Sequence, residues 1–340
     1  MMKKSEIVIS TAHVESRLRG DFWREVTRPF FLSSFADEVN PEASIRSRAF
    51  DTGTIALISF SAQQCRRDRK VVASSDLADY LVQLVVSGNV TGDFGEPSFR
   101  ASRGDVFIID LAKPYITLSD AGSRLSVAVP RERLEKMVGR RNLHGLTLKA
   151  DWPFTRLLTD YMQGLFSVAS GPISAEESSA AQDALVTLVA GNLSGKAPML
   201  PGYPSELSVV LRERMLAYID EHLRDADLGP QKLMTRFRIS RAHLYRAFEE
   251  DGGISRLIRE KRLDLAYRML SVPSSNTSVD SIKRLGLECG FTSPENFSRA
   301  FRERFGTTPG QVRKGEAPTG VRGADQFDIQ AYFTTFTNAD

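Results

Sequence analysis

Basic and aromatic side chains gather on one short segment near residue 240, where they could donate hydrogen bonds to a polyanion. Arg241, Tyr245 and Arg246 are interleaved with the apolar residues Leu244 and Phe248. In a helix, Leu244 and Phe248 share one face, so the two arginines and the tyrosine lie on the other. Arginine forms paired hydrogen bonds with phosphate and with guanine O6 and N7. This segment therefore suggests binding to DNA and not the breaking of a bond.

The same pattern occurs a second time, 53 residues further along the chain. Ser240–Phe248 and Ser293–Phe301 share a serine, then three residues, then leucine or phenylalanine, then one residue, then Arg-Ala-Phe. A solvated helix face is the usual explanation for one exposed arginine. It does not explain two superposable helices with an outward arginine at the same position. We therefore predict two DNA-recognition helices.

The outward positions of both helices are the predicted DNA contacts. Residues 206–316 contain 20 lysines and arginines against 16 acidic residues, an excess of four, so affinity must come from placement and not from bulk charge. The predicted contacts are Arg241, Ala242, Tyr245 and Arg246 in the first helix and Glu295, Ser298, Arg299 and Arg302 in the second.

Local signals around both segments predict a pair of helix-turn-helix units. Ser240 is a suitable N-cap, and Ser293 is an N-cap followed by Pro294 at the first helical position. Gly290 suits the positive φ of a tight turn between helices. A longer helix over 255–271 is predicted to join the two units. Two such units could enter successive major-groove segments.

Residues 206–314 resemble the AraC/XylS family of bacterial transcription regulators. The resemblance is carried by Gly290-Phe291, Ser293, Phe297–Phe301, Phe305-Gly306 and Thr308-Pro309. It implies two helix-turn-helix units joined by a linker helix, with Arg241, Ala242, Tyr245 and Arg246, then Pro294, Glu295, Ser298 and Arg299, at the contacting positions. Arg238 lies where many members have a turn glycine. Pro294 and Glu295 are poor donors to base edges, so we expect the second unit mainly to bind phosphate.

The N-terminal half has the texture of an all-β domain. Apolar runs such as Thr54–Phe60, Tyr80–Val86 and Val106–Leu111 recur every 8–12 residues, separated by Gly, Asn, Asp and Pro. Residues 45–130 are also similar, less specifically, to the sensor barrel of one branch of the same family. The predicted fold class is α+β multidomain, with an N-terminal cupin-like β-barrel, covering helices and a C-terminal all-α double helix-turn-helix domain.

Helical periodicity follows the strands at 131–138, 152–168 and 174–193. The apolar stripe with Leu185 and Val189 either covers the barrel or forms a homodimer interface. Three prolines and a glycine within 196–205 predict a linker. The predicted domains are a sensor over 1–172, a dimerisation helix and linker over 173–205, the DNA-binding domain over 206–316 and a tail over 317–340.

Composition weighs against several other classes of protein. Two cysteines do not make a disulfide framework, and we expect no signal peptide, no membrane span and a cytoplasmic location. None of the four histidines lies within 45–129, which argues against a metal-dependent barrel enzyme but leaves an apolar ligand pocket open. No catalytic residue, metal site or cofactor is predicted. Arg66–Lys70 could meet an anionic ligand or form a solvated loop.

These observations predict a sequence-specific transcription regulator that binds double-stranded promoter DNA. The family tendency favours an activator that contacts RNA polymerase and is controlled by a small-molecule effector or by homodimerisation. Two alternatives stay open, namely a barrel enzyme targeted to DNA and a non-specific architectural DNA-binding protein.

Overall fold

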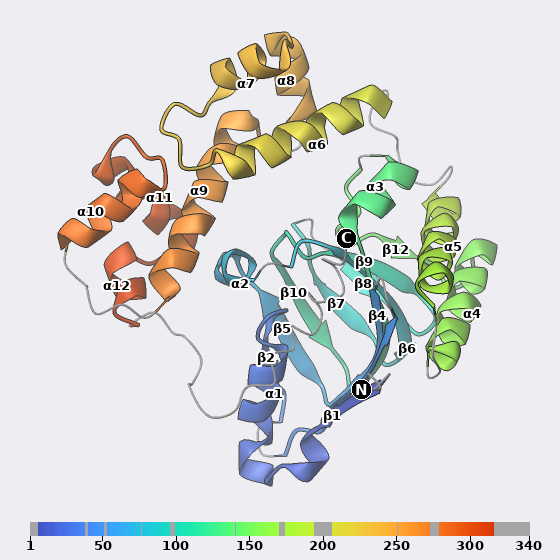
Figure 1. The fold of residues 1–340 in the computed structure, drawn as a ribbon. Helices are drawn as coiled ribbons and strands as arrows, with labels where there is room; N and C mark the ends of the chain where they lie inside the picture. The colour runs from blue at the N-terminus through green and yellow to red at the C-terminus, as the bar shows by residue number, and fades with distance from the viewer. Residues whose placement is uncertain are drawn as a thin grey trace. The chain divides into compact units, whose positions relative to one another are not determined.

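The computed structural model describes residues 6–315, apart from 38–39, 51–52, 76, 96–98, 140, 170–173, 194–205, 250 and 273–278. The described residues form two compact units, one ending at Leu193 and one starting at Glu206. The predicted linker over 196–205 and the predicted tail over 317–340 lie outside the described residues. Figure 1 shows the two units, and each is described by itself.

The N-terminal unit contains two antiparallel sheets. The larger sheet has seven strands in the order β1-β3-β4-β11-β6-β9-β12, and the smaller has five in the order β2-β5-β10-β7-β8. The strands are β1 (Glu6–Ser10), β2 (Leu32–Phe35), β3 (Ala43–Phe50), β4 (Gly53–Phe60), β5 (Gln63–Arg67), β6 (Tyr80–Ser87), β7 (Val90–Asp93), β8 (Phe99–Ala101), β9 (Val106–Asp110), β10 (Tyr115–Ser119), β11 (Gly122–Val129) and β12 (Thr147–Leu148).

The central strands of the larger sheet are buried on both faces, and their alternate residues pack in two different cores. In β9, Val106 and Ile108 pack in one core with residues of α3, α4 and α5, while Phe107 and Ile109 pack in the other with Phe99 and Tyr115 of the smaller sheet. Figure 1 shows α4 and α5 along one side of the larger sheet. The helices of this unit are α1 (Arg19–Thr27), α2 (Arg69–Ser74), α3 (Arg131–Val138), α4 (Pro153–Val168) and α5 (Ala175–Leu193), with short 3-10 turns at Thr11–His13 and Ser16–Leu18.

The predicted mixture of a β-rich domain and an all-helical domain is confirmed. The apolar runs at 54–60, 80–86 and 106–111 form β4, β6 and β9. The predicted helix over 131–138 is α3, and those over 152–168 and 174–193 are α4 and α5 with starts one residue later. Strands β1, β2, β3, β5, β7 and β12 and helices α1 and α2 were not predicted.

The C-terminal unit is helical throughout its described residues. Apolar residues at intervals of three and four give each helix one buried face, which packs on α9 or on a neighbouring short helix. The helices are α6 (Glu206–Glu221), α7 (Pro230–Phe237), α8 (Arg241–Ala247), α9 (Ile254–Ser271), α10 (Val279–Glu288), α11 (Pro294–Phe305) and α12 (Pro309–Arg313).

Candidate nucleic-acid interface

Helices α7 and α8 form the first helix-turn-helix unit. Pro230 stands at the start of α7, which ends at Phe237, and the C-cap residue Arg238 has a φ of 53° and a ψ of 46° in the left-handed region. The Ser240 side chain then accepts a hydrogen bond from the backbone N–H of His243 and caps α8. The turn is therefore formed in the usual left-handed conformation, although arginine stands where glycine would be unstrained.

The two faces of α8 differ sharply in exposure. Leu244 and Phe248 are fully buried in a core with Leu233 of α7 and with Ile254 and Ile258 of α9. The predicted contacts Arg241, Ala242, Tyr245 and Arg246 are all exposed. The Arg241 guanidinium lies 5.3 Å from the centre of the Tyr245 ring, so these two side chains form one cationic and aromatic surface.

Helices α10 and α11 form the second unit on the same plan. Gly290 has a φ of 83° in the turn, and the Ser293 side chain accepts a hydrogen bond from Asn296 N–H at the start of α11. Pro294 occupies the first turn of the helix, as predicted. The buried face of α11 is aromatic, with Phe297, Phe301 and Phe305 packed on one another at centroid distances of 5.6 and 4.7 Å.

The outer face of α11 presents the other four predicted contacts. Glu295, Ser298, Arg299 and Arg302 are exposed. A hydrogen bond from the Ser293 hydroxyl lowers the pKa of Glu295, so a negative charge stands at the start of this helix. Arg299 donates to Asn296 Oδ1 at 2.9 Å, which holds its guanidinium along the helix surface. This face combines two cations with a fixed anion, whereas α8 presents no acidic group among the four predicted contacts.

Charged residues that join both units to α9 were absent from the predicted site. Arg304 of α11 donates to both carboxylate oxygens of Asp264, at 2.8 and 2.9 Å. Arg262 of α9 donates to the carbonyls of Leu223 and Asp225 beside the first unit. The helical period could have shown that Arg304 and Arg302 lie on different faces of α11, because a shift of two positions along a helix turns the side chain by about 200° around the axis.

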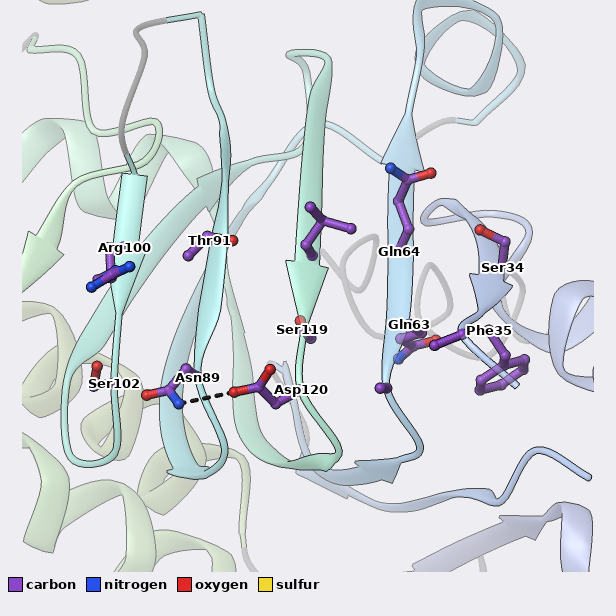
Figure 2. A pocket seen from close by; sticks show the side chains of 13 residues that line it. Ser34, Phe35, Gln63, Gln64, Asn89, Thr91, Arg100, Ser102, Ser119 and Asp120 are labelled. Carbon is purple, nitrogen blue, oxygen red and sulfur yellow. Dashed lines mark hydrogen bonds between the residues drawn. The ribbon is translucent and has the colours of Figure 1, made fainter. Parts of the chain in front are cut away.

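The N-terminal unit contains an open hollow of about 640 Å³ on its five-stranded sheet. Figure 2 shows Arg100, Thr91, Gln64 and Ser34 along neighbouring strands, with Asn89 hydrogen-bonded to Asp120 at one end. The space between the two sheets is occupied by Phe94, Phe99, Phe107 and Tyr115. The hollow is lined by polar and apolar residues alike and lies on the sheet surface, unlike the apolar interior pocket that the sequence left open.

The segment Arg66–Lys70 is not a loop, because it spans the end of β5 and the start of α2, and it contains one buried arginine. Arg67 ends β5 and is fully buried, and its guanidinium donates to the carbonyls of Pro29, Phe30 and Leu111 and to the Ser75 hydroxyl at 2.6–2.9 Å. Asp68 caps α2 through the N–H groups of Lys70 and Val71. The guanidinium therefore holds loops together, because buried carbonyls need donors that the sheet does not supply.

The apolar stripe of α5 is buried within the N-terminal unit. Leu185 and Val189 are fully covered and pack in the core formed with the larger sheet. Thr155 of α4 donates to Asn192 of α5 at 2.7 Å, and the Tyr161 hydroxyl donates to the Ala181 carbonyl at 2.8 Å. Covering the sheet therefore accounts for this stripe, whatever the oligomeric state.

Two searches over the described part of the chain bear on other classes of site. No group of three or more His, Cys, Asp or Glu side chains in this part is arranged to hold a metal ion. No helix in it is both long enough and apolar enough to cross a membrane.

Comparison with known proteins identifies the class of protein. Residues 233–315 match the model of a helix-turn-helix domain, and residues 34–194 match that of an AraC-binding-like domain. The chain is thus a DNA-binding transcription regulator with an N-terminal β-rich domain and a C-terminal helix-turn-helix domain. It belongs to the AraC family of transcription regulators.

Relatives and a solved structure agree with this family. The chain is 28% identical over 290 residues to the transcriptional activator NphR of a Rhodococcus species, covering 82% of this chain and 83% of NphR. It is 37% identical over 101 residues to the regulator ArgR of Pseudomonas aeruginosa, covering 29% of this chain and 26% of ArgR. The crystal structure of the AraC-like transcriptional activator CuxR shares the fold, with a TM-score of 0.53 and 22% identity over 77% of this chain and 95% of CuxR.

Proposed function

We propose that α8 and α11 enter successive major-groove segments of one promoter duplex. The observation that carries this proposal is the pair of capped helices whose inner faces are buried and whose predicted contacts are all exposed. Helices of this kind dock in the major groove when they are the second member of a helix-turn-helix unit.

The two helices have different tasks in this proposal. Arg241, Tyr245 and Arg246 contact base edges, with arginine favouring guanine, and Ala242 allows the helix to approach closely. Arg299 and Arg302 bind phosphates, Ser298 adds a hydroxyl donor, and Glu295 limits the approach of α11 to the backbone. Sequence preference is therefore concentrated in the first unit.

Regulation is proposed to be activation of transcription through RNA polymerase. NphR is named a transcriptional activator and matches over most of both chains, which supports this sign of regulation. A DNA partner also implies action in the cytoplasm. The proposal includes no catalysis, since we can assign no nucleophilic side chain with a neighbouring general base among the described residues.

The N-terminal unit is proposed to bind an effector or a second copy of the chain. The match to the AraC-binding-like domain supports a sensor role, and the open hollow of Figure 2 is one place for a small molecule. The domain limits predicted from the sequence, with a sensor over 1–172 and a dimerisation segment over 173–205, belong to the same proposal.

A second copy would find its apolar surface on α4 and not on the buried stripe of α5. Phe154, Leu157 and Val168 are 50%, 54% and 65% exposed, and together with Tyr161 and Gly164 they form one stripe at alternating steps of three and four. The space over Gly164 is open. In an antiparallel pair of α4 helices, Leu157 of each copy would meet Gly164 of the other. We expect Leu157→Asp to yield monomers in sedimentation equilibrium, and a wild-type chain that is already monomeric would contradict this pairing.

Binding of the full chain to selected DNA tests the function. At about 0.15 M salt, we expect affinity for a promoter fragment enriched from genomic DNA to exceed that for a random duplex by at least about a thousandfold. Equal affinities would favour the architectural alternative. Turnover of a metabolite by the full chain would favour the targeted enzyme.

A further inference from the structure

Helix α9 is shared by the cores of both helix-turn-helix units. Ile254 and Ile258, in its first half, are buried with Leu244 and Phe248 of the first unit. Tyr267, in its second half, packs against Phe301 and Phe305 of the second unit at centroid distances of 6.1 and 4.7 Å. The position of α11 relative to α8 is therefore set along this one helix.

The middle of α9 carries charged residues that bond to α6 and to the turn between α6 and the first unit. Lys261 donates to both carboxylate oxygens of Asp220 in α6, at 2.7 and 3.0 Å. Arg262 donates to the Leu223 carbonyl at 3.0 Å and to the Asp225 carbonyl at 2.6 Å, just beyond α6. These bonds fix the rotation of α9 against α6 because each has a required direction.

Carboxylates of the same segment of α9 hold the second unit through Arg304. The Arg304 guanidinium bonds to Asp264 through Nε and Nη2, and its Nη1 lies 3.1 Å from Glu260 Oε2. The three side chains are only 11%, 19% and 29% exposed for Arg304, Asp264 and Glu260. Arg304 lies on α11 itself, on the side away from the exposed Arg302.

Stability alone is a weak explanation for this arrangement. A partly buried ion pair contributes little net stability, because desolvation of the charges offsets much of their attraction. Two parallel hydrogen bonds from a planar guanidinium do, however, fix an angle and a distance. The apolar contacts of the Phe297, Phe301 and Phe305 face are non-directional and do not by themselves fix the rotation of α11.

We propose that Arg304 is a positioning residue for DNA binding. With Glu260 and Asp264, it holds α11 at the distance and rotation from α8 at which Arg299 and Arg302 reach phosphates of the duplex that α8 contacts. The proposal rests on the proposed function, since it presumes that both helices bind one duplex. Once α8 is bound, binding of phosphate by the second unit is an intramolecular step. This step adds affinity only if the second unit is held at the correct position relative to the first.

The test compares two duplexes of equal length and sequence. One has ordinary phosphates throughout, and the other has neutral methylphosphonate linkages over the segment facing α11. For the full-length wild-type chain at low salt, we expect the affinity for the ordinary duplex to be at least about ten times the affinity for the partly neutral duplex. The quotient of these two affinities is the ratio compared below. For Arg304→Lys, which keeps the charge but not the paired bonds, we expect the ratio to fall to within about threefold of unity. Affinity for the partly neutral duplex should stay unchanged.

A matched control separates positioning from general loosening. Arg212→Lys breaks a similar ion pair, 13% and 22% exposed, between Arg212 of α6 and Asp251 in the segment between α8 and α9, and this pair includes no residue of α10 or α11. It should preserve the ratio even if both affinities fall. Asp264→Asn is the second variant and should act like Arg304→Lys, with circular dichroism showing that helix content is retained.

The outcomes distinguish this proposal from the proposed function. A wild-type chain that binds neither duplex overturns both. A wild-type chain that binds both duplexes equally overturns the proposed phosphate contacts of α11 together with the positioning role, whereas an Arg304→Lys chain with the wild-type ratio overturns only the positioning role. A fall of the ratio in Arg212→Lys as large as that in Arg304→Lys also overturns it.

Discussion

The two helix-turn-helix units have the same arrangement of helices and turn, but their buried faces differ in aromatic content and their exposed faces differ in charge. The inner face of α11 is built from three packed phenylalanines, whereas α8 buries Leu244 and Phe248 against mainly aliphatic partners. The outer face of α8 has the better donors for bases, while α11 carries Glu295 at its start. The buried core residues and the proposed DNA contacts lie on separate faces, so each set can vary without the other.

The turns of the two units show the same contrast. Gly290 could not accept a side chain, because a Cβ there would lie 2.7 Å from Arg262 Nε and 2.9 Å from the Leu223 carbonyl oxygen. The first unit has Arg238 in the corresponding left-handed conformation, with φ at 53°. The second turn is thus tied to its surroundings, whereas the first tolerates a strained residue.

The largest expected effect comes from removing the aromatic core of the second unit. Phe301→Ala should lower the free energy of unfolding of α10–α12 by roughly 3–5 kcal/mol, because it empties a fully buried site between Phe297 and Phe305. Amide hydrogen exchange in α10–α12 measures the change. Ser298→Ala, on the exposed face, is the control. Equal protection in the two variants would contradict the account of this core.

The next effect concerns the turn before α11. Gly290→Ala should destabilise the second unit by roughly 1–3 kcal/mol, since the new methyl group meets Arg262 and the backbone and φ is positive. Hydrogen exchange should rise in α10 and α11 but not in α7 and α8. Gly315→Ala is a useful comparison, because open space surrounds that glycine although its φ is also positive.

Substitutions on the outer faces test the division between base and phosphate contacts. Arg246→Ala should cost roughly 1–3 kcal/mol on the preferred site and relax base preference at one position. Arg299→Ala should weaken binding to all duplexes alike and reduce the salt slope by about 1. Titrations over a series of salt concentrations measure both. If Arg299→Ala relaxed base preference and Arg246→Ala weakened all duplexes alike, the assignment of base contacts to α8 and phosphate contacts to α11 would be reversed.

The smallest expected effect is a gain in the stability of the first unit. Arg238→Gly should stabilise the first unit by up to about 1 kcal/mol, because glycine adopts the left-handed conformation without the strain of a side chain. Thermal unfolding of the full chain with DNA absent measures it. A loss of stability would mean that the Arg238 side chain makes contacts worth more than the strain.

The helix-turn-helix units were predictable because their signals are local. Ser240, Ser293 and Pro294 set helix starts within a few residues, and the phenylalanines at intervals of four define the buried face of α11. Arg304 was not predicted, because its partners Glu260 and Asp264 lie about 40 residues away on another helix. A face can be derived from periodicity, but an ion pair across helices cannot.

The N-terminal unit was only partly predictable for a related reason. Strands β4, β6 and β9 are apolar in sequence, whereas β5 is Gln-Gln-Cys-Arg-Arg and β3 contains Arg46 and Arg48. Arg67 becomes a core residue only because carbonyls from distant loops surround it. No local pattern contains that information.

Selection of binding sites from a randomised duplex library tests the central comparison most directly. The full chain should select one major-groove segment with strong base preferences and a neighbouring segment, about one helical turn away, with weak ones. Arg246→Ala should relax the preference at one position of the strong segment, and Arg299→Ala should leave all preferences of that segment intact. Equally strong preferences in both segments, or loss of the strong one in Arg299→Ala, would contradict the division of tasks between α8 and α11.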